Sequence, residues 1–154
     1  MTLTVREQIL ANLQTTLEGI SVDNGYDNDF SNVQRWLQAG NSYSNTPYII
    51  IEAGEEEYNS APNPLRSCKM AVYLEVGTVQ SSDDTGSTDT LINSLLGDIL
   101  KSVVVDITRG GIAKETNVLG AVPFEGTQGQ PFVGVMVTLE IMYRYLFTDP
   151  KQAM

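Results

Sequence analysis

The acidic residues are the side chains most able to do chemistry in this sequence, and several stand close together. Three consecutive glutamates, Glu55 to Glu57, could form an acid/base site, and Asp23, Asp27 and Asp29 alternate like calcium ligands. The aspartates lack the glycine and the terminal glutamate that a calcium loop needs at fixed offsets. Adjacent carboxylates without a partner stay in water. We therefore expect a solvated strand end and a solvated turn at these places, and no metal site.

Composition argues against catalysis. The sequence has no histidine, which removes the commonest general base, metal ligand and partner of a nucleophilic serine or cysteine. The single cysteine, Cys68, falls on the apolar side of an alternating segment, which favours a small buried hydrophobe over a reactive thiol. The sequence has no glycine-rich phosphate loop and no CxxC, HExxH or nucleophile-elbow motif. We expect a protein that is not an enzyme and holds no cofactor.

The charge balance is strongly acidic, with 19 acidic against 9 basic residues and a net charge of −10. Such a surface repels phosphate backbones, so conventional nucleic-acid binding is not expected. The 154 residues show neither an internal repeat nor a linker, which predicts a single domain over residues 1–154. No apolar run approaches the roughly 20 residues of a membrane helix, and the start has no signal segment. We expect a protein made in the cytoplasm, without a membrane partner.

Two segments have the apolar spacing of amphipathic helices. The first covers Val5 to Glu18, where Thr4 and Glu7 are placed to form a capping box, with hydroxyl and carboxylate each accepting from a backbone amide. The second covers Thr88 to Val105, and its stripe is broad enough for deep burial against a sheet or a second subunit. The run Arg109 to Gly111 breaks the second pattern.

Alternating or β-branched residues predict five strands. Their ranges are 32–38, 48–52, 66–78, 118–124 and 133–147, followed by a polar tail from Asp149 to Met154. The order is therefore α-β-β-β-α-β-β. Two helices and a mainly antiparallel or mixed sheet predict an α+β fold with both helices packed on one face of the sheet.

This order of elements resembles the tail-terminator family of long-tailed bacteriophages, the U-like minor tail proteins. The segments that carry the resemblance are the helix Val5 to Glu18, the alternating segment Val33 to Leu37, the strand Tyr48 to Glu52 with its acidic loop, the long strand Met70 to Val76, the helix Leu91 to Val103, and the closing strand Val133 to Phe147. The resemblance covers nearly the whole chain and is a pattern of elements.

The resemblance implies a structural protein of the virion tail or neck. Members of the family form six-fold rings that cap the finished tail tube, stop its polymerisation and provide the surface that a filled head joins. The partners implied are other copies of the chain in a hexameric ring, the tail tube protein and a head or neck connector protein. DNA would pass through the ring without specific binding, and no catalytic residue is carried over.

Contacts between subunits are expected at sheet edges and long loops, where unpaired backbone groups can join chains. Arg35 and Trp36 belong to residue types enriched in interfaces, although core or edge packing would explain them equally well. The aromatic end of the last strand adds Tyr143 and Tyr145 as interface candidates. Each contact in a ring is heterologous, so one patch meets a different patch on the next subunit.

The acidic charge acquires a function in a ring, because a negative channel would let DNA slide through without sticking. The segment from Glu52 to Asp98 contains nine acidic residues against two basic ones. The candidates to face the channel are Glu55, Glu56, Glu57, Asp83 and Asp84. The alternative is that these charges lie on the outer wall and keep the protein soluble.

Other functions remain open at this stage. The chain could be another ring of the same virion, such as a neck or head-completion connector, or a tail tube subunit. It could also be a non-phage protein-interaction module of the same α+β shape, or an enzyme that transfers protons with lysine or glutamate. Fold resemblance alone does not decide among these functions.

Overall fold

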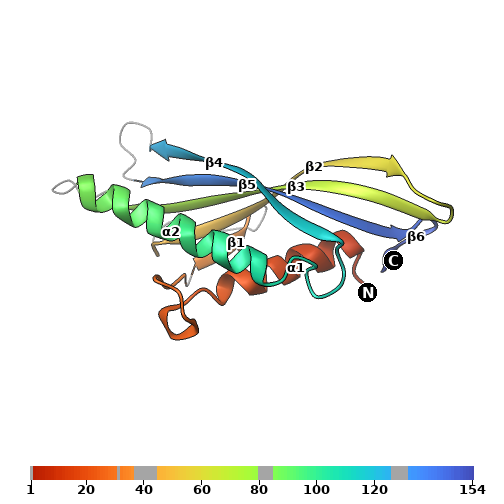
Figure 1. Cartoon of the computed structure of the whole chain (residues 1–154), viewed down its shortest axis with the longest axis horizontal. Helices are drawn as coiled ribbons and strands as arrows, with labels where there is room; N and C mark the ends of the chain where they lie inside the picture. Colours follow the sequence, from red (N-terminus) through yellow and green to blue (C-terminus); the bar gives the residue numbers. More distant parts are fainter. Residues whose placement is uncertain (1, 31, 37–44, 80–84, 126–131) are drawn as a thin grey trace.

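The computed structural model describes residues 2–30, 32–36, 45–79, 85–125 and 132–154. These residues form two helices, a short 3-10 turn and a six-stranded sheet (Figure 1). The elements are α1 (Val5–Glu18), η1 (Val22–Asn24), β1 (Asn32–Arg35), β2 (Tyr48–Ser60), β3 (Leu65–Val79), α2 (Thr85–Val105), β4 (Glu115–Glu125), β5 (Phe132–Leu146) and β6 (Asp149–Ala153). The α+β fold predicted from the sequence is confirmed, with one strand more than expected.

The sheet is mixed, with the strand order β1-β2-β3-β5-β4. The short β1 runs parallel to β2, and every other pairing is antiparallel. Strand β6 pairs with the end of β5, beyond the part of β5 that β4 covers. Strands β1 and β4 therefore form two opposite edges of the sheet.

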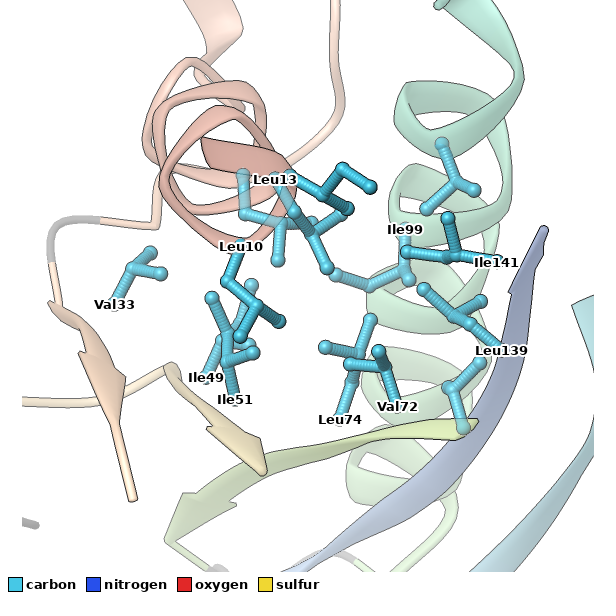
Figure 2. Close-up of a cluster of buried hydrophobic side chains, with 14 of the residues drawn as sticks. Leu10, Leu13, Val33, Ile49, Ile51, Val72, Leu74, Ile99, Leu139 and Ile141 are labelled. Atoms are coloured by element: carbon cyan, nitrogen blue, oxygen red, sulfur yellow. The ribbon is translucent and has the colours of Figure 1, made fainter. Parts of the chain in front are cut away.

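Both helices lie on the same face of the sheet, as the apolar stripes predicted. Figure 2 shows Leu10 and Leu13 of α1 and Ile99 of α2 pointing toward side chains of the sheet such as Leu74 and Leu139. These five side chains are at most 3% exposed. Each contributes about 1.5–3 kcal/mol by leaving water, so this shared core holds the two layers together.

Helix α1 begins at the predicted residue, but the side chain of Glu7 does not cap it. The Thr4 hydroxyl accepts a hydrogen bond from the Glu7 amide at 3.2 Å, which is one half of the predicted capping box. The Glu7 carboxylate instead accepts both guanidinium nitrogens of Arg35, at 3.1 and 3.0 Å. A bidentate ion pair to a cation is stronger than a bond to a neutral amide, so α1 is tied to β1 by this pair.

Helix α2 ends where the sequence indicated. Arg109, Gly110 and Gly111 have φ angles of +48°, +73° and +85°, a left-handed conformation that cannot continue a right-handed helix. Arg109 is fully buried, and its guanidinium donates to the carbonyl oxygens of Val103 (2.7 Å) and Asp106. A buried cation there satisfies carbonyls that the end of α2 leaves free and complements the negative end of the helix dipole.

Several boundaries differ from those predicted. Strand β2 does not end at Glu52 but continues through the acidic run to Ser60. The segment predicted as a polar tail forms β6, and β4 is longer than residues 118–124. Helix α2 starts at Thr85, three residues before the predicted start. In each case backbone pairing or helix geometry extends into polar residues that carry no apolar period.

Candidate assembly surfaces

A β-bulge decides which way the three glutamates of β2 point. The register between β2 and β3 shifts between Ala53 and Glu56, so one strand contributes extra residues there. After the shift, Glu56 pairs with Met70 and faces the helix side, whereas Glu57 pairs with Lys69 on the opposite face. Glu55 and Glu57 are exposed, as predicted. The prediction of a solvated carboxylate is wrong for Glu56, whose side chain is only 11% exposed.

Glu56 is the centre of a polar cluster under the sheet. Its Oε1 lies 3.2 Å from Arg6 Nη1 of α1 and accepts the hydroxyl of Tyr143 from β5. Its Oε2 accepts the hydroxyl of Tyr58 at 2.7 Å. Arg6 also donates to the Gly54 carbonyl at 3.2 Å, which holds the bulge itself. The cluster therefore joins α1, β2 and β5.

The titratable side chains in and beside this cluster have raised pKa values, which is typical of groups that hold a structure together. Burial, reinforced by the bond to Glu56, raises the pKa of the Tyr143 phenol well above its usual value. The hydrogen bond to Glu56 raises the pKa of Tyr58 to about 12. Burial also raises the pKa of the nearby Cys68 thiol, as expected for an inert core cysteine. All three groups hold their protons near neutral pH, so they do not supply an acid/base pair.

The face of the sheet opposite the helices is acidic. We call it the open face and define its charged residues as Glu52, Glu57, Glu75, Glu115, Glu140, Lys69 and Arg144. Cross-strand partners share a face, and Glu52 pairs with Tyr73 while Ala71 pairs with Glu140. On β3 these open-face residues alternate with the buried Val72 and Leu74. On β2, β3, β4 and β5, these five carboxylates outnumber the two cations on this face.

The interface candidates Arg35 and Trp36 occupy different environments. Arg35 is held in its ion pair with Glu7. Trp36 is 53% exposed, and its backbone amide donates to the Ile51 carbonyl at 2.9 Å. The Trp36 ring borders a small hollow of about 50 Å³ on the open face, together with Tyr73 and other side chains. The structure therefore gives Trp36 accessible surface and gives Arg35 an intramolecular partner.

The remaining predicted site residues do not form one surface with Trp36. Tyr143, predicted as an interface residue, is instead a core residue with 2% exposure, because strand alternation directs it toward the helices. Tyr145 is partly buried, with its ring centroid 6.3 Å from that of Tyr143. Asp83 and Asp84, the other candidates to face a channel, lie outside the described residues.

Sequence reasoning missed a surface where the sheet extends past the helices (Figure 1). We call it the arm tip and define it by Tyr58, Arg66 and Phe147. The Arg66 guanidinium carbon lies 5.4 Å from the centroid of the Tyr58 ring and 4.7 Å from that of Phe147. The two aromatic rings are 54% and 55% exposed, and they border a hollow of about 470 Å³. Tyr58 and Arg66 lie on β2 and β3, whereas Phe147 directly follows β5, so no spacing in the sequence links Phe147 to the other two.

A second missed surface is a groove between the first half of α2 and the strands β4 and β5. We call it the end groove. Its apolar lining is Ile92, Leu96, Ala121, Pro123, Phe124 and Val133, and its volume is about 630 Å³. The carboxylates of Asp89 and Glu125 belong to the same lining, and both residues are exposed. The groove is therefore apolar inside and acidic at its rim.

Comparison with protein-family models and with curated proteins gives no match for this chain. Across the described ranges, histidine, cysteine and carboxylate side chains nowhere gather in a group of three or more able to hold a metal ion. Neither helix of the described part is both long enough and apolar enough to cross a membrane. Function is therefore argued from the surfaces themselves.

Proposed function

We propose that this protein is the repeating subunit of a closed ring at the end of a bacteriophage tail, a tail terminator. The observation that carries the proposal is the open face, a sheet surface that neither described helix covers and whose charged side chains on β2 to β5 are predominantly acidic. In the ring this face would line a channel through which DNA passes. The ring would cap the tail tube, stop its growth and present a surface to the head.

The open face has the chemistry that such a channel needs. Its backbone groups are paired along the sheet, so the surface presents side chains and no row of free amides that could hold phosphates. Glu52, Glu57, Glu75, Glu115 and Glu140 repel the phosphate backbone, and on β2 to β5 they outnumber the cations Lys69 and Arg144. DNA can then move along the wall without being trapped.

The edge strand β4 is suited to join subunits through side-chain contacts rather than through pairing of strands between subunits. Edge strand β4 carries a register shift between Val118 and Gly120 and a proline, Pro123, two devices that interrupt strand addition. It also presents Leu119 and Val122, which are 59% and 66% exposed. An edge of this kind disfavours open-ended strand addition and leaves apolar side chains to form contacts.

The mass of the purified protein in solution tests the proposal. Light scattering over a range of protein and salt concentrations is expected to show a closed particle of six chains of 16.9 kDa each, and electron microscopy should show rings with a central hole. Filaments that lengthen with concentration would replace the terminator with a tail tube subunit. A monomer at every concentration would contradict the ring and favour an ordinary binding module.

A further inference from the structure

The arm tip has the composition and geometry of a protruding patch that binds in a pocket of another protein. Arginine and tyrosine are enriched among the side chains that dominate interfaces, and two exposed aromatic rings are a large apolar area for one surface. Arg66 is held between Tyr58 and Phe147, which fixes its orientation before any partner arrives. In the described part of the chain, Arg66 forms no ion pair with a carboxylate. Its guanidinium donors are therefore suited to an external carboxylate.

The end groove is the complementary surface on the same chain. Its interior, formed by side chains such as Ile92, Leu96 and Phe124, is the environment that an aromatic ring prefers. Asp89 and Glu125 supply carboxylates at the rim. A protruding apolar and cationic patch thus has a counterpart that is hollow, apolar and anionic.

The two surfaces lie at opposite ends of the longest axis of the molecule. Figure 1 shows the β2–β3 hairpin at one end, and the start of α2 with the end of β4 at the other. One chain cannot bring its own arm tip into its own end groove. Two different patches at opposite ends are what a heterologous contact between identical subunits requires.

We propose that the arm tip of one copy binds in the end groove of the next copy, an inference that rests on the ring proposed above. Phe147 and Tyr58 enter the apolar interior, and Arg66 donates to Asp89 and Glu125 at the rim. The chain is acidic overall, with 19 acidic against 9 basic residues, so a partly exposed arginine that forms no ion pair among the described residues is a scarce and directional contact. Repetition of this one contact around an axis closes the ring.

Charge reversal tests the contact. R66E is expected to raise the protein concentration needed for ring assembly by about 30-fold or more, because it removes a central arginine and places like charges together. The pair D89K and E125K in one chain should do the same. Combining all three substitutions in one chain should restore assembly to within about threefold of the wild type, since the charges are again opposite. K151E, an exposed control with the same charge change as R66E, should leave assembly unchanged.

Circular dichroism and thermal unfolding show whether each variant is folded, and F147S tests the apolar part of the contact without changing charge. If F147S and R66E both assemble like the wild type, the inference is overturned while the ring remains. If the wild type itself stays monomeric, both the ring and this contact are overturned. Loss of assembly in both variants, with rescue by the triple substitution, supports the inference.

Cysteine cross-linking identifies the two patches directly. F147C and A121C combined in one chain should form disulfide ladders of up to six chains on mild oxidation, whereas each single variant should give none. The native Cys68 is fully buried and does not compete for oxidation. Ring-sized particles that give no ladder would exclude the proposed contact and leave the ring proposal intact.

Discussion

Glu56 forms an ion pair with Arg6 and accepts hydrogen bonds from the hydroxyls of Tyr58 and Tyr143. These three partners come from α1, β2 and β5. A partly buried carboxylate is stable only when its oxygens are satisfied, and here both oxygens have partners. The bulge at Gly54 and Glu55 makes this possible, because without it the carboxylate at 56 would point to the open face. The cost of burying a charge is offset by fixing the end of β2 against α1 and β5.

Alkaline pH should destabilise the protein through the tyrosines of this cluster. An unfolded tyrosine has a pKa of 10.0, and the folded pKa is raised to about 12 for Tyr58 and is also raised for the more deeply buried Tyr143. The folded state therefore binds more protons above pH 10. The stabilisation is fully present below pH 10 and is lost as the pH rises through the folded values. Urea unfolding at pH 8, 10 and 11 should show a falling free energy of unfolding.

The variant Y143F separates this effect from general alkaline denaturation. At pH 8 it should lower the free energy of unfolding by about 1.5–3 kcal/mol, because Glu56 loses a hydrogen-bond donor. Its further loss between pH 10 and 11 should be smaller than that of the wild type, since one titrating group is gone. Y26F, which removes the hydroxyl of a partly buried tyrosine that does not contact Glu56, is the control. An alkaline loss in Y143F as steep as that in the wild type would refute the assignment.

At the scale of elements, one aspartate on α2 orders the loop between α1 and β1. Asp98 is 4% exposed and accepts the backbone amides of Asp27 and Asn28 at 3.1 and 2.9 Å. The Asn28 side chain adds a donor at 2.9 Å to Asp98 and another at 3.0 Å to Ser94. The aspartates that alternate like calcium ligands thus belong to a loop that a carboxylate of the chain itself holds in place.

The substitution D98A should lower the free energy of unfolding by about 3 kcal/mol, because it leaves two backbone donors and one amide donor without their acceptor. D98N keeps one acceptor oxygen and should lose less. E18A removes an exposed carboxylate from α1, outside the proposed contact between copies, and should change stability by less than about 0.5 kcal/mol. Equilibrium unfolding in urea measures all three. Equal values for D98A and E18A would show that Asp98 does not anchor the loop.

Elements with a strong apolar period were predictable from the sequence, and those defined by backbone pairing alone were not. The stripe from Val5 to Leu17 and the alternation of β3 and β5 follow directly from residue types. Strand β6 has no apolar alternation, so only its pairing with Tyr145 and Leu146 reveals it. The bulge in β2 depends on register with β3, which a single strand does not encode.

The candidate surfaces were less predictable than the elements, because tertiary structure assembles them. Trp36 was proposed for an interface from its residue type, and the structure shows that it is exposed, whereas its role stays a prediction. Phe147 lies far from Tyr58 and Arg66 in the sequence, and only the pairing of β3 with β5 brings it beside them. Arg66 and Phe147 each lie near one end of a long predicted strand, which makes both candidates for a surface. Neither residue predicts that the other lies beside it.

At the scale of the whole molecule, the acidic charge on the open face predicts how the ring interacts with DNA. The helix layer and the open face are both acidic, but only the open face would line the channel of the proposed ring. Wild-type rings should therefore not bind DNA. Reversing two open-face charges, E57K and E140K, should create a basic wall, and binding to short linear duplexes should weaken by about tenfold or more between 50 and 200 mM salt.

The shape of the DNA then distinguishes a channel wall from an outer wall. A preformed ring can thread onto a linear duplex but not onto a closed circular plasmid, so E57K with E140K should bind linear DNA far better than circular DNA of the same sequence. E18K with D23K makes the same charge change at exposed positions on the helix layer and should bind both forms equally. Fluorescence anisotropy and gel shift measure both. Equal binding of the two forms by the open-face variant would place Glu57 and Glu140 outside the channel, because an outer surface does not need a free DNA end.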